Sequence, residues 1–378
     1  MSVLGVVAAV LAGASIPLNL WQWWLGFRFP SRGGEVAVHF TPAISVLKPL
    51  KDCDAGTERC LESWFQQEYP AGLQLLFGVA SGQDPVCAVV EKLREKYPDR
   101  HAELILAHPV LGPNGKVSTL CHLSARARHE YLVISDADVF VEKKFLSQFL
   151  PALRDESVGL VNCFYILANP TSLATRLEAL AVNADFWSSV LQGISLGRMD
   201  FALGAVMAMR RCDLARIAGF ERWVELLADD YQLGNEIAES GKQVIISPLR
   251  VECREENRGP RTVWRRQLRW ARTLRVCRPA GYFFSVLGNG TLWPALAFAV
   301  GAPGGGWLLG IGLGVRMLGA LSNYRKLTGR APPWVPFLAP LKDLAQLAFW
   351  TLAFTGNKIT WHNQRFRVNR GGKLTPLA

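Results

Sequence analysis

The chain has 378 residues, half of them hydrophobic and only 19% charged, which is apolar for a soluble enzyme of this size. Its eight cysteines include no C-x-x-C pair, which argues against structural zinc and a disulfide framework and favours reduced thiols in a cytoplasmic compartment. The net charge of +11 is concentrated, because ten arginines and no lysine fall between residues 250 and 278. Such a block suits anionic lipid or phosphate as well as nucleic acid.

The N-terminal stretch is a predicted membrane anchor. Residues 2–27 carry no charge and exceed the ~20 residues needed to span a bilayer. Tryptophans gather near the end of this stretch, where an interfacial belt belongs, and Arg28 and Arg32 follow. A cleaved signal peptide is the alternative, but the stretch has no basic n-region and is too long. The arginines predict that the following residues face the cytoplasm.

Residues 43–250 alternate short apolar runs with helical stretches. The predicted strands are 44–50, 73–81, 102–108 and 131–135, and the predicted helices between them are 55–68, 84–97 and 115–127. This alternation indicates an α/β fold with a mostly parallel sheet and helices on both faces. Ligands of such sheets bind beyond the carboxyl ends of the strands.

Aspartates follow two of these strands, so we expect them to face one crevice. Asp84 comes after the second strand, and Asp136 and Asp138 end the apolar run "YLVISDADVF". A D-x-D pair on a strand-end turn offers hard oxygen ligands for Mg²⁺ or Mn²⁺, held together with a substrate diphosphate. The alternative is that these aspartates cap the next segment, 141–150.

Further polar residues could join this site. Asp229 and Asp230 stand at a predicted helix start, where simple N-capping is the alternative role. Lys116, in the loop "GPNGK", is a candidate ligand for a donor phosphate or base, or else an ordinary exposed lysine. The long apolar stretch 172–193 is helical in period, and it either lines a lipid entrance or is a plain core helix.

The motif "RRQLRW" lies in a helical part of the arginine-rich block. Arg266, Arg269 and Trp270 stand at i, i+3 and i+4, on one face of a helix. Two guanidinium groups beside an indole suit a ligand that carries phosphate and a ring. A basic helix at the membrane interface is the alternative.

A second apolar region follows residue 279. Residues 281–300 and 307–324 are predicted as two membrane segments joined by a Gly-rich turn. The second segment contains Arg316, which is costly in a bilayer unless it reaches the interface or finds a partner. A third stretch, 334–356, either spans the membrane, which places the tail outside, or lies along the interface, which keeps the tail inside.

In this order, "SGQDP" with Asp84, "ISDADV" with Asp136, "LADDYQLG" with Asp230, and "RQLRW" resemble the D, D, D, (Q/R)-x-x-R-W signature of membrane-bound family 2-type glycosyltransferases. Within this group, the chain resembles ceramide glucosyltransferases and the bacterial transferase associated with hopanoid biosynthesis. The resemblance extends from the anchor to the tail "WHNQRFRVNRGG". It implies a GT-A fold, a UDP-sugar donor, inversion at the anomeric carbon and a lipid acceptor in the bilayer, with no nucleic acid partner.

The resemblance also implies roles for the site residues. Asp84 would contact uridine, Asp136 and Asp138 would hold the metal and diphosphate, and Asp230 would be the general base. Arg266, Arg269 and Trp270 would position the diphosphate and the acceptor. Animal ceramide glucosyltransferases tend to have glycine in place of Asp138, so the full D-x-D motif is closer to the hopanoid branch. That branch would imply N-acetylglucosamine and a hopanoid polyol in place of glucose and ceramide.

We therefore expect a multi-pass protein of a bacterial inner membrane with a cytoplasmic catalytic domain. The expected parts are an anchor, a GT-A domain, membrane segments and a basic tail, at 1–27, 28–280, 281–356 and 357–378. Three other functions share parts of the pattern. A processive polysaccharide synthase usually has more spans, a nucleotidyltransferase releases pyrophosphate, and a non-catalytic nucleotide-sugar binder would carry a vestigial signature.

Overall fold

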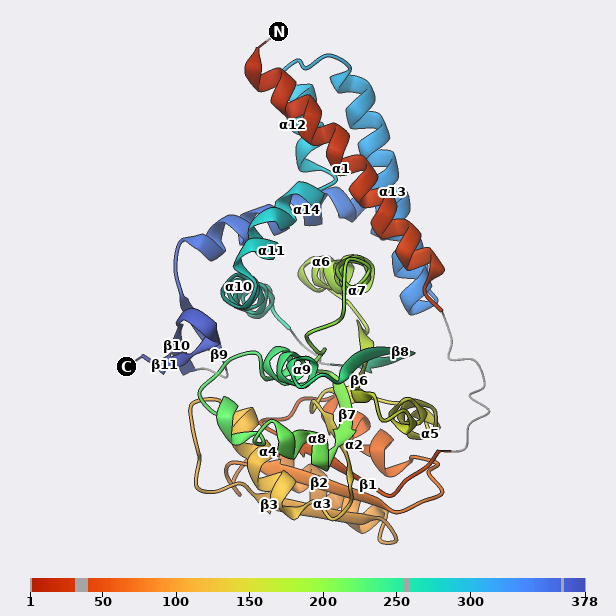
Figure 1. Ribbon diagram of the computed structural model, residues 1–378, viewed down its shortest axis with the longest axis vertical. Helices are drawn as coiled ribbons and strands as arrows, with labels where there is room; N and C mark the ends of the chain where they lie inside the picture. The colour runs from red at the N-terminus through yellow and green to blue at the C-terminus, as the bar shows by residue number, and fades with distance from the viewer. Residues whose placement is uncertain (1, 31–39, 255–257, 362–363, 378) are drawn as a thin grey trace.

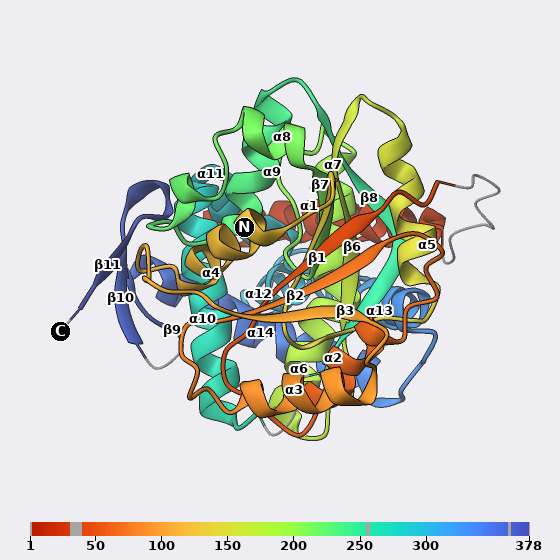
Figure 2. The ribbon, with the colours of Figure 1, turned by 90° about the horizontal axis from the view of Figure 1, so that it is seen from below.

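The computed structural model describes residues 2–30, 40–254, 258–361 and 364–377, so the predicted interfacial Arg32 lies outside the described residues. An eight-stranded sheet has the order β3-β2-β1-β4-β7-β6-β8-β5 (Figures 1 and 2). Its strands are Ile44–Pro49 (β1), Leu73–Val79 (β2), His101–Leu106 (β3), Tyr131–Ser135 (β4), Val139–Phe140 (β5), Val158–Leu167 (β6), Val206–Arg210 (β7) and Gln243–Cys253 (β8). β3, β2, β1 and β4 run parallel, as do β6 and β8, while β7 and β5 are antiparallel to their neighbours. The prediction of a mostly parallel sheet is confirmed.

Helices cover both faces of this sheet, as predicted. One apolar core contains buried side chains of α2 (Thr57–Phe65), α3 (Val86–Lys96) and α5 (Phe145–Phe149). The other contains buried side chains of α4 (Gly115–Arg126), α8 (Arg211–Arg216) and α9 (Asp229–Glu239). The predicted helix 55–68 ends early, at Phe65. Pro70 follows soon after, and a proline disfavours helical backbone in the residue before it.

The predicted helix 172–193 is a continuous helical layer between the sheet and the apolar helices. It consists of α6 (Leu173–Leu180), a π-helical segment (Ala181–Phe186) and α7 (Trp187–Ile194). The side chain of Ser172 caps its start by accepting a hydrogen bond from the Thr175 amide. Trp187 packs against Phe164 of β6 on one side, and Leu180 packs with residues 320–339 on the other. The layer is therefore packed as a core helix on both sides.

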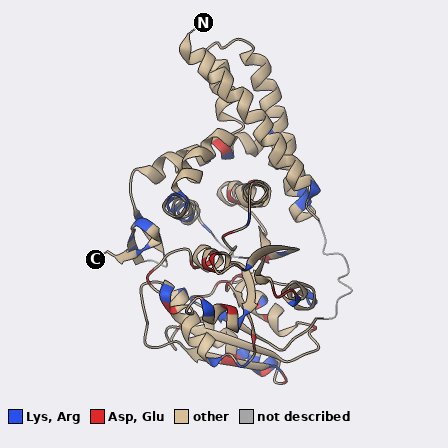
Figure 3. Ribbon diagram, in the orientation of Figure 1, with Lys and Arg blue, Asp and Glu red and all other residues tan. Residues whose placement is uncertain are grey.

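Three apolar helices project from the rest of the molecule (Figures 1 and 3). They are α1 (Val3–Arg28), α12 (Leu292–Ala299) and α13 (Gly305–Thr328). Within the described part of the chain, α1 and α13 are the two helices long and apolar enough to cross a membrane. Arg28 is the last residue of α1, Arg316 lies at the middle of α13, and Arg325 and Lys326 lie in the last turn of α13. Figure 3 shows blue on these helices at the end away from the projecting tip.

The predicted membrane segment 281–300 is wrong as a single helix. The chain there forms α11 (Pro279–Phe284), one 3₁₀ turn and the short α12. The break lies at 288–291, where the Asn289 side chain accepts hydrogen bonds from the Thr291 and Leu292 amides, at 3.2 and 2.8 Å. These bonds satisfy amides at the start of a new helix. Eight residues of helix are too few to span a bilayer.

Arg316 of α13 has carboxylate partners, which a charged side chain needs because its burial in an apolar region costs free energy. Its guanidinium pairs with both carboxylate oxygens of Asp343, at 2.8 and 2.9 Å, and with Asp185 of the π-helical segment, at 2.8 Å. Lys342 also pairs with Asp185 and Asp343. All four side chains are at most 15% exposed. Through Asp185, the cluster thus connects the π-helical segment to α13 and α14.

Helix α14 (Trp334–Phe354) lies across the base of the projecting helices, above α10 (Pro260–Cys277) and α6 (Figure 1). After it, the chain forms a C-terminal sheet of β9 (Lys358–Trp361), β10 (Gln364–Val368) and β11 (Leu374–Pro376). This three-stranded sheet lies beside α10, on the side of α10 that is nearer to the eight-stranded sheet (Figures 1 and 2). Helix α14 lies across the projecting helices, and the two predicted positions for 334–356, across the membrane or along its interface, stay predictions.

Candidate active site

Charged side chains from three separate segments meet at the carboxyl end of β4. The Lys116 ammonium, in the first turn of α4, lies 2.8 Å from the Asp136 carboxylate and 3.0 Å from the Asp229 carboxylate. Burial would lower the pKa of Lys116, but Asp136, Asp229 and Asp230 together raise it. Lys116 is therefore not an ordinary exposed lysine. It is protonated and lies at the centre of an acidic cluster.

Asp230 is a third carboxylate near Lys116, and its proton affinity is perturbed. Its pKa is raised to about 6, first because the group is buried and second because Asp229 adds a like charge. Gly204 makes room for it, since a Cβ at position 204 would lie 2.9 Å from an Asp230 carboxylate oxygen. A carboxyl group with a pKa near neutrality can accept a proton during a reaction.

The D-x-D turn is supported from behind by Lys48 of β1. This lysine is fully buried, and its ammonium donates to the Ser135 hydroxyl at 3.1 Å and to the Asp136 carbonyl at 2.6 Å. It also lies 4.7 Å from the centre of the Trp64 ring. Burial lowers the pKa of Lys48 to about 8, against the opposing effect of nearby groups that include Asp136 and Asp138. Lys48 was not predicted, although a lone lysine in an apolar strand was a usable signal.

The D-x-D aspartates do not cap the next helix. Lys144, not an aspartate, precedes α5, and its side chain makes no capping hydrogen bond. The Asp138 carbonyl instead accepts from the Arg254 amide at 2.9 Å and the Cys60 thiol at 3.2 Å. The Asp136 side chain is 38% exposed, so its oxygens can reach a ligand. Two carboxylates on a fixed, partly exposed turn fit a hard divalent cation that a diphosphate also ligates.

Asp84 lies at the end of β2, as predicted, and its contacts are local. Its carboxylate accepts hydrogen bonds from the Val86 amide and the Asp52 amide, each at 3.0 Å. The second bond fixes the loop after β1, where Asp52 has a left-handed φ of 58°. The described contacts of Asp84 do not join it to the Lys116 cluster: Asp84 lies after β2, and the cluster lies after β4. That these aspartates face one crevice stays a prediction.

The two arginines of "RQLRW" have different surroundings. Arg266 pairs with the buried Glu178 of α6, with its Nε 2.7 Å from one carboxylate oxygen and an Nη 2.6 Å from the other. Glu178 also accepts from Arg258 at 3.1 Å and from Gln267 at 3.2 Å. Arg266 further lies over the Trp270 ring, at 5.3 Å from its centre. Glu178 was not predicted, although it is one of two acidic residues in an apolar helix.

Arg269 instead lies near the acidic cluster. Its guanidinium is 5.8 Å from the centre of the Trp361 ring of the C-terminal sheet. Burial, and then the like charge of Arg266, lower the pKa of Arg269 to about 10, whereas Asp230, Asp136 and Asp229 oppose that change. At neutral pH it is a half-buried cation close to three carboxylates.

Most of the arginine-rich block has partners within the chain. Beside the Glu178 pairs, Arg254 pairs with Glu252, Arg278 with Asp200, Arg272 with the Lys358 carbonyl and Arg275 with Asn357. Arg261 and Arg265 are exposed. The block therefore joins elements around the candidate site, in addition to presenting charge outward.

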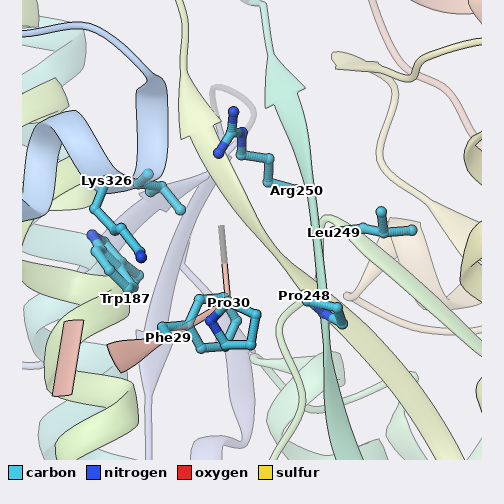
Figure 4. Close-up of a pocket in the computed structure, with 8 residues that line it drawn as sticks. Phe29, Pro30, Trp187, Pro248, Leu249, Arg250 and Lys326 are labelled. Carbon is cyan, nitrogen blue, oxygen red and sulfur yellow. The ribbon is translucent and has the colours of Figure 1, made fainter. Parts of the chain in front are cut away.

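A small pocket elsewhere contains none of these aspartates. It lies where α1 and α13 end against β8 (Figure 4), and its lining residues are Phe29, Pro30, Trp187, Pro248, Leu249, Arg250, Lys326 and Leu327. The acidic cluster, not this pocket, is the candidate active site.

The fold is the GT-A fold of nucleotide-sugar transferases, as predicted. The chain is similar to the solved mannosyltransferase PcManGT from Pyrobaculum calidifontis in complex with GDP-Man and Mn²⁺, with a TM-score of 0.55 and 22% identity over 93% of this chain and 98% of that one. A family model described as glycosyl transferase family 21 matches residues 4–374. The chain belongs to glycosyl transferase family 21, which confirms the predicted class of enzyme, a glycosyltransferase.

Curated relatives agree with this family. The chain is 26% identical to ceramide glucosyltransferase 1 of Caenorhabditis elegans over 207 residues, which are 54% of this chain and 44% of that protein. It is 30% identical to the ceramide glucosyltransferase of Candida albicans over 122 residues, which are 29% of this chain and 22% of that protein. The chain therefore matches less than half of the length of either relative.

Proposed function

We propose that this protein transfers a hexose, glucose or N-acetylglucosamine, from a UDP-sugar to a hydroxyl group of a hopanoid-like or ceramide-like membrane lipid, with inversion. The observation that carries the proposal is the cluster of Lys116, Asp136, Asp229 and Asp230 at the end of β4. It combines one cation for a diphosphate, carboxylates for a metal and a carboxylate of raised pKa for a proton. Membership of family 21 supports the reaction type.

Asp230 would act as the general base. With a pKa of about 6 the carboxylate is ionised at neutral pH but still basic enough to take a proton. The acceptor hydroxyl loses its proton to Asp230, and its oxygen forms a bond to the anomeric carbon. The bond from that carbon to the diphosphate oxygen breaks, and its electrons leave with UDP. Attack opposite to the leaving group gives inversion.

Cationic groups would hold the leaving diphosphate. We assign this role to Lys116, at the centre of the acidic cluster, and to Arg269 near it; Lys116 already contacts Asp136. Arg266 is held by Glu178 and lies over the Trp270 ring, so we assign it to fixing the position of α10, the helix that carries Arg269. Asp84 would contact the uridine part, as in the family it resembles.

Asp136 and Asp138 would hold Mg²⁺ or Mn²⁺. Their fixed turn, the exposure of Asp136 and the hard character of carboxylate oxygens fit such an ion. When bound, the ion neutralises charge that develops on the leaving diphosphate. Lys48 would keep the turn in place through its bond to the Asp136 carbonyl.

A bilayer position would bring the acceptor to this site. Large apolar side chains are exposed on α11 and α14, near the base of the two helices that are long enough to span a membrane, namely Phe283, Phe284, Phe337, Leu341, Leu344 and Phe354. Exposed apolar surface of this kind marks a membrane or partner contact. A lipid hydroxyl at headgroup level would then meet the domain below α14.

The test is a transfer assay with the purified full chain in lipid nanodiscs. UDP-glucose or UDP-N-acetylglucosamine is added with Mg²⁺ or Mn²⁺ and with either ceramide or a hopanoid polyol. We expect UDP release and a lipid whose mass increases by one hexose or N-acetylhexosamine. A water-soluble polymer would instead identify a polysaccharide synthase, pyrophosphate would identify a nucleotidyltransferase, and no UDP release with any donor would reject the transferase.

A further inference from the structure

The loop before the proposed base has a strained backbone. Ala228, the residue before α9, has φ 60° and ψ 56°, in the left-handed region. A residue with a Cβ adopts this conformation only at an energetic cost, because its Cβ comes too close to the following carbonyl oxygen. Such strain persists only where the surroundings hold the chain in place. The conformation of this base loop, residues 224–228, sets the direction in which α9 begins and thus where Asp230 lies.

The C-terminal sheet holds one side of the base loop. The Leu227 amide donates to the Gly372 carbonyl at 2.8 Å, and the Leu374 amide donates to the Glu225 carbonyl at 2.8 Å. Between these bonds, Leu226 and Lys373 face each other as an antiparallel bridge. The buried side chains of Leu227 and Leu374 lie in one apolar cluster with those of β9 and β10. Residues 372–374 therefore pair with residues 225–227 of the base loop through one antiparallel bridge and its two flanking hydrogen bonds.

The opposite side of the base loop is held by the segment that carries Lys116. The Asn114 amide donates to the Val224 carbonyl at 2.8 Å, and the Asn114 side chain donates to the Leu226 carbonyl at 2.7 Å. The same side chain caps α4 by accepting from the Val117 amide at 3.1 Å. The base loop is thus held between the Lys116 helix and the C-terminal sheet.

The C-terminal sheet also reaches two other parts of the site. The Gln232 side chain, on the helix of the base, donates to the Gly371 carbonyl at 3.2 Å. Trp361 of β9 lies against Arg269, and Arg272 of the same helix donates to the Lys358 carbonyl. A segment far from the D-x-D turn in sequence therefore contacts the helices of both the base and the diphosphate arginine.

We propose that residues 372–374, which lead into β11, are positioning residues that fix the base loop and thereby place Asp230 for proton transfer. This inference rests on the proposed role of Asp230. Residues 372–374 touch no reacting atom in it, and they act through the backbone of residues 225–227. Displacing a reacting group by about 1 Å can lower a rate by about 10²-fold, so a small shift of the base loop is enough.

Two adjacent glycines provide a matched test. Gly371 and Gly372 both have a left-handed φ, of 73° and 86°, so an alanine at either position strains the tail. A Cβ at position 372 would lie 3.3 Å from the Leu227 carbonyl oxygen, whereas a Cβ at 371 would have no atom within 4 Å. Gly372→Ala therefore pushes on the base loop, and Gly371→Ala is its control.

We expect Gly372→Ala to lower kcat for transfer at least about tenfold relative to Gly371→Ala, with the KM for the UDP-sugar within about twofold. Hydrogen exchange of the peptide covering 224–232 should be faster in Gly372→Ala alone. If Gly372→Ala does not fold, Leu374→Ala, with the exposed Thr375→Ala as control, makes the same comparison, because Leu374 packs against Leu227.

Equal kcat and equal exchange in the two variants of a pair would overturn the inference. A loss of kcat that is matched by an equal loss of donor binding and a lower unfolding temperature would overturn it too, since that pattern shows general destabilisation. Failure of the proposed function is separate: the wild-type chain would then release no UDP with any donor. Hydrogen exchange would still report whether the tail holds the loop.

Discussion

Two clusters of buried charge in this protein differ in balance and in exposure. Among the apolar helices, Arg316 and Lys342 face Asp185 and Asp343, and all four side chains are nearly inaccessible. At the end of β4, the Lys116 ammonium faces Asp136, Asp229 and Asp230, and Asp136 is 38% exposed. The first cluster has equal numbers of the two charges, while the second has an excess of negative charge on its open side.

This difference separates a structural cluster from a functional one. Buried charges are stable only when each has partners of opposite sign, and the helix cluster meets this condition within the chain. The acidic cluster meets it incompletely, so a divalent cation that binds together with the donor diphosphate would supply the missing positive charge. Perturbed proton affinity, as at Asp230, is likewise concentrated at functional sites.

The largest expected effect is on the acidic cluster. Asp230→Asn removes the proposed base but keeps the shape of the side chain, and we expect kcat to fall about 10²- to 10⁴-fold. Steady-state UDP release in the presence of acceptor lipid measures this loss. Asp99→Asn, an exposed aspartate just before β3 and therefore at the amino end of the parallel strands, opposite to the cluster, should retain full activity. An Asp230→Asn variant with wild-type kcat would assign the base to another residue.

The helix cluster should respond in stability instead. Arg316→Met leaves Asp343 and Asp185 with fewer partners, and breaking a buried pair in this way costs about 3–5 kcal/mol. Denaturant unfolding in detergent measures the change, and the exposed Arg325→Met serves as control. The activity of the fraction that remains folded should stay within about twofold of wild type. A selective loss of kcat without loss of stability would contradict the comparison.

Lys48 lies behind the acidic cluster and should show an intermediate effect. Lys48→Met removes its hydrogen bonds to Ser135 and the Asp136 carbonyl, and loss of such supporting groups costs about 10- to 100-fold in metal affinity or activity. Titrating activity with Mn²⁺ measures it. Lys51→Met, an exposed lysine three residues later, is the control. Unchanged Mn²⁺ dependence in Lys48→Met would show that the turn needs no such support.

The smallest effect concerns the pH dependence of the reaction. The base must be ionised, so kcat/KM should fall as the pH drops through about 6. In Asp229→Asn the like charge beside Asp230 is absent, so the pKa of Asp230 should decrease and the acid limb should move to lower pH. Burial, the larger cause, remains, so the limb should stay above the ordinary range of aspartate. A limb that moves to higher pH would contradict this account.

The strand and helix pattern and the strand-end aspartates were predictable from local sequence. The spacing of apolar residues and the turn residues on either side predict elements such as the strand 131–135. A D-x-D pair that ends an apolar strand is also visible without a structure. Long-range partners were not predictable. Nothing local indicates that Glu178 meets Arg266, 88 residues away, or that Gly372 meets Leu227. The break in 281–300 was also missed, because hydropathy does not register the capping by Asn289.

The central claim is that Asp230 transfers a proton while a sugar moves from UDP to a lipid. The most direct measurement follows UDP release and glycolipid formation in the same reaction, for the wild-type chain and for Asp230→Asn. The account predicts equal amounts of UDP and glycolipid from the wild type, and neither product at a comparable rate from the variant. Glycolipid formed equally fast by both proteins, or UDP released by the wild type with no lipid product, would contradict it.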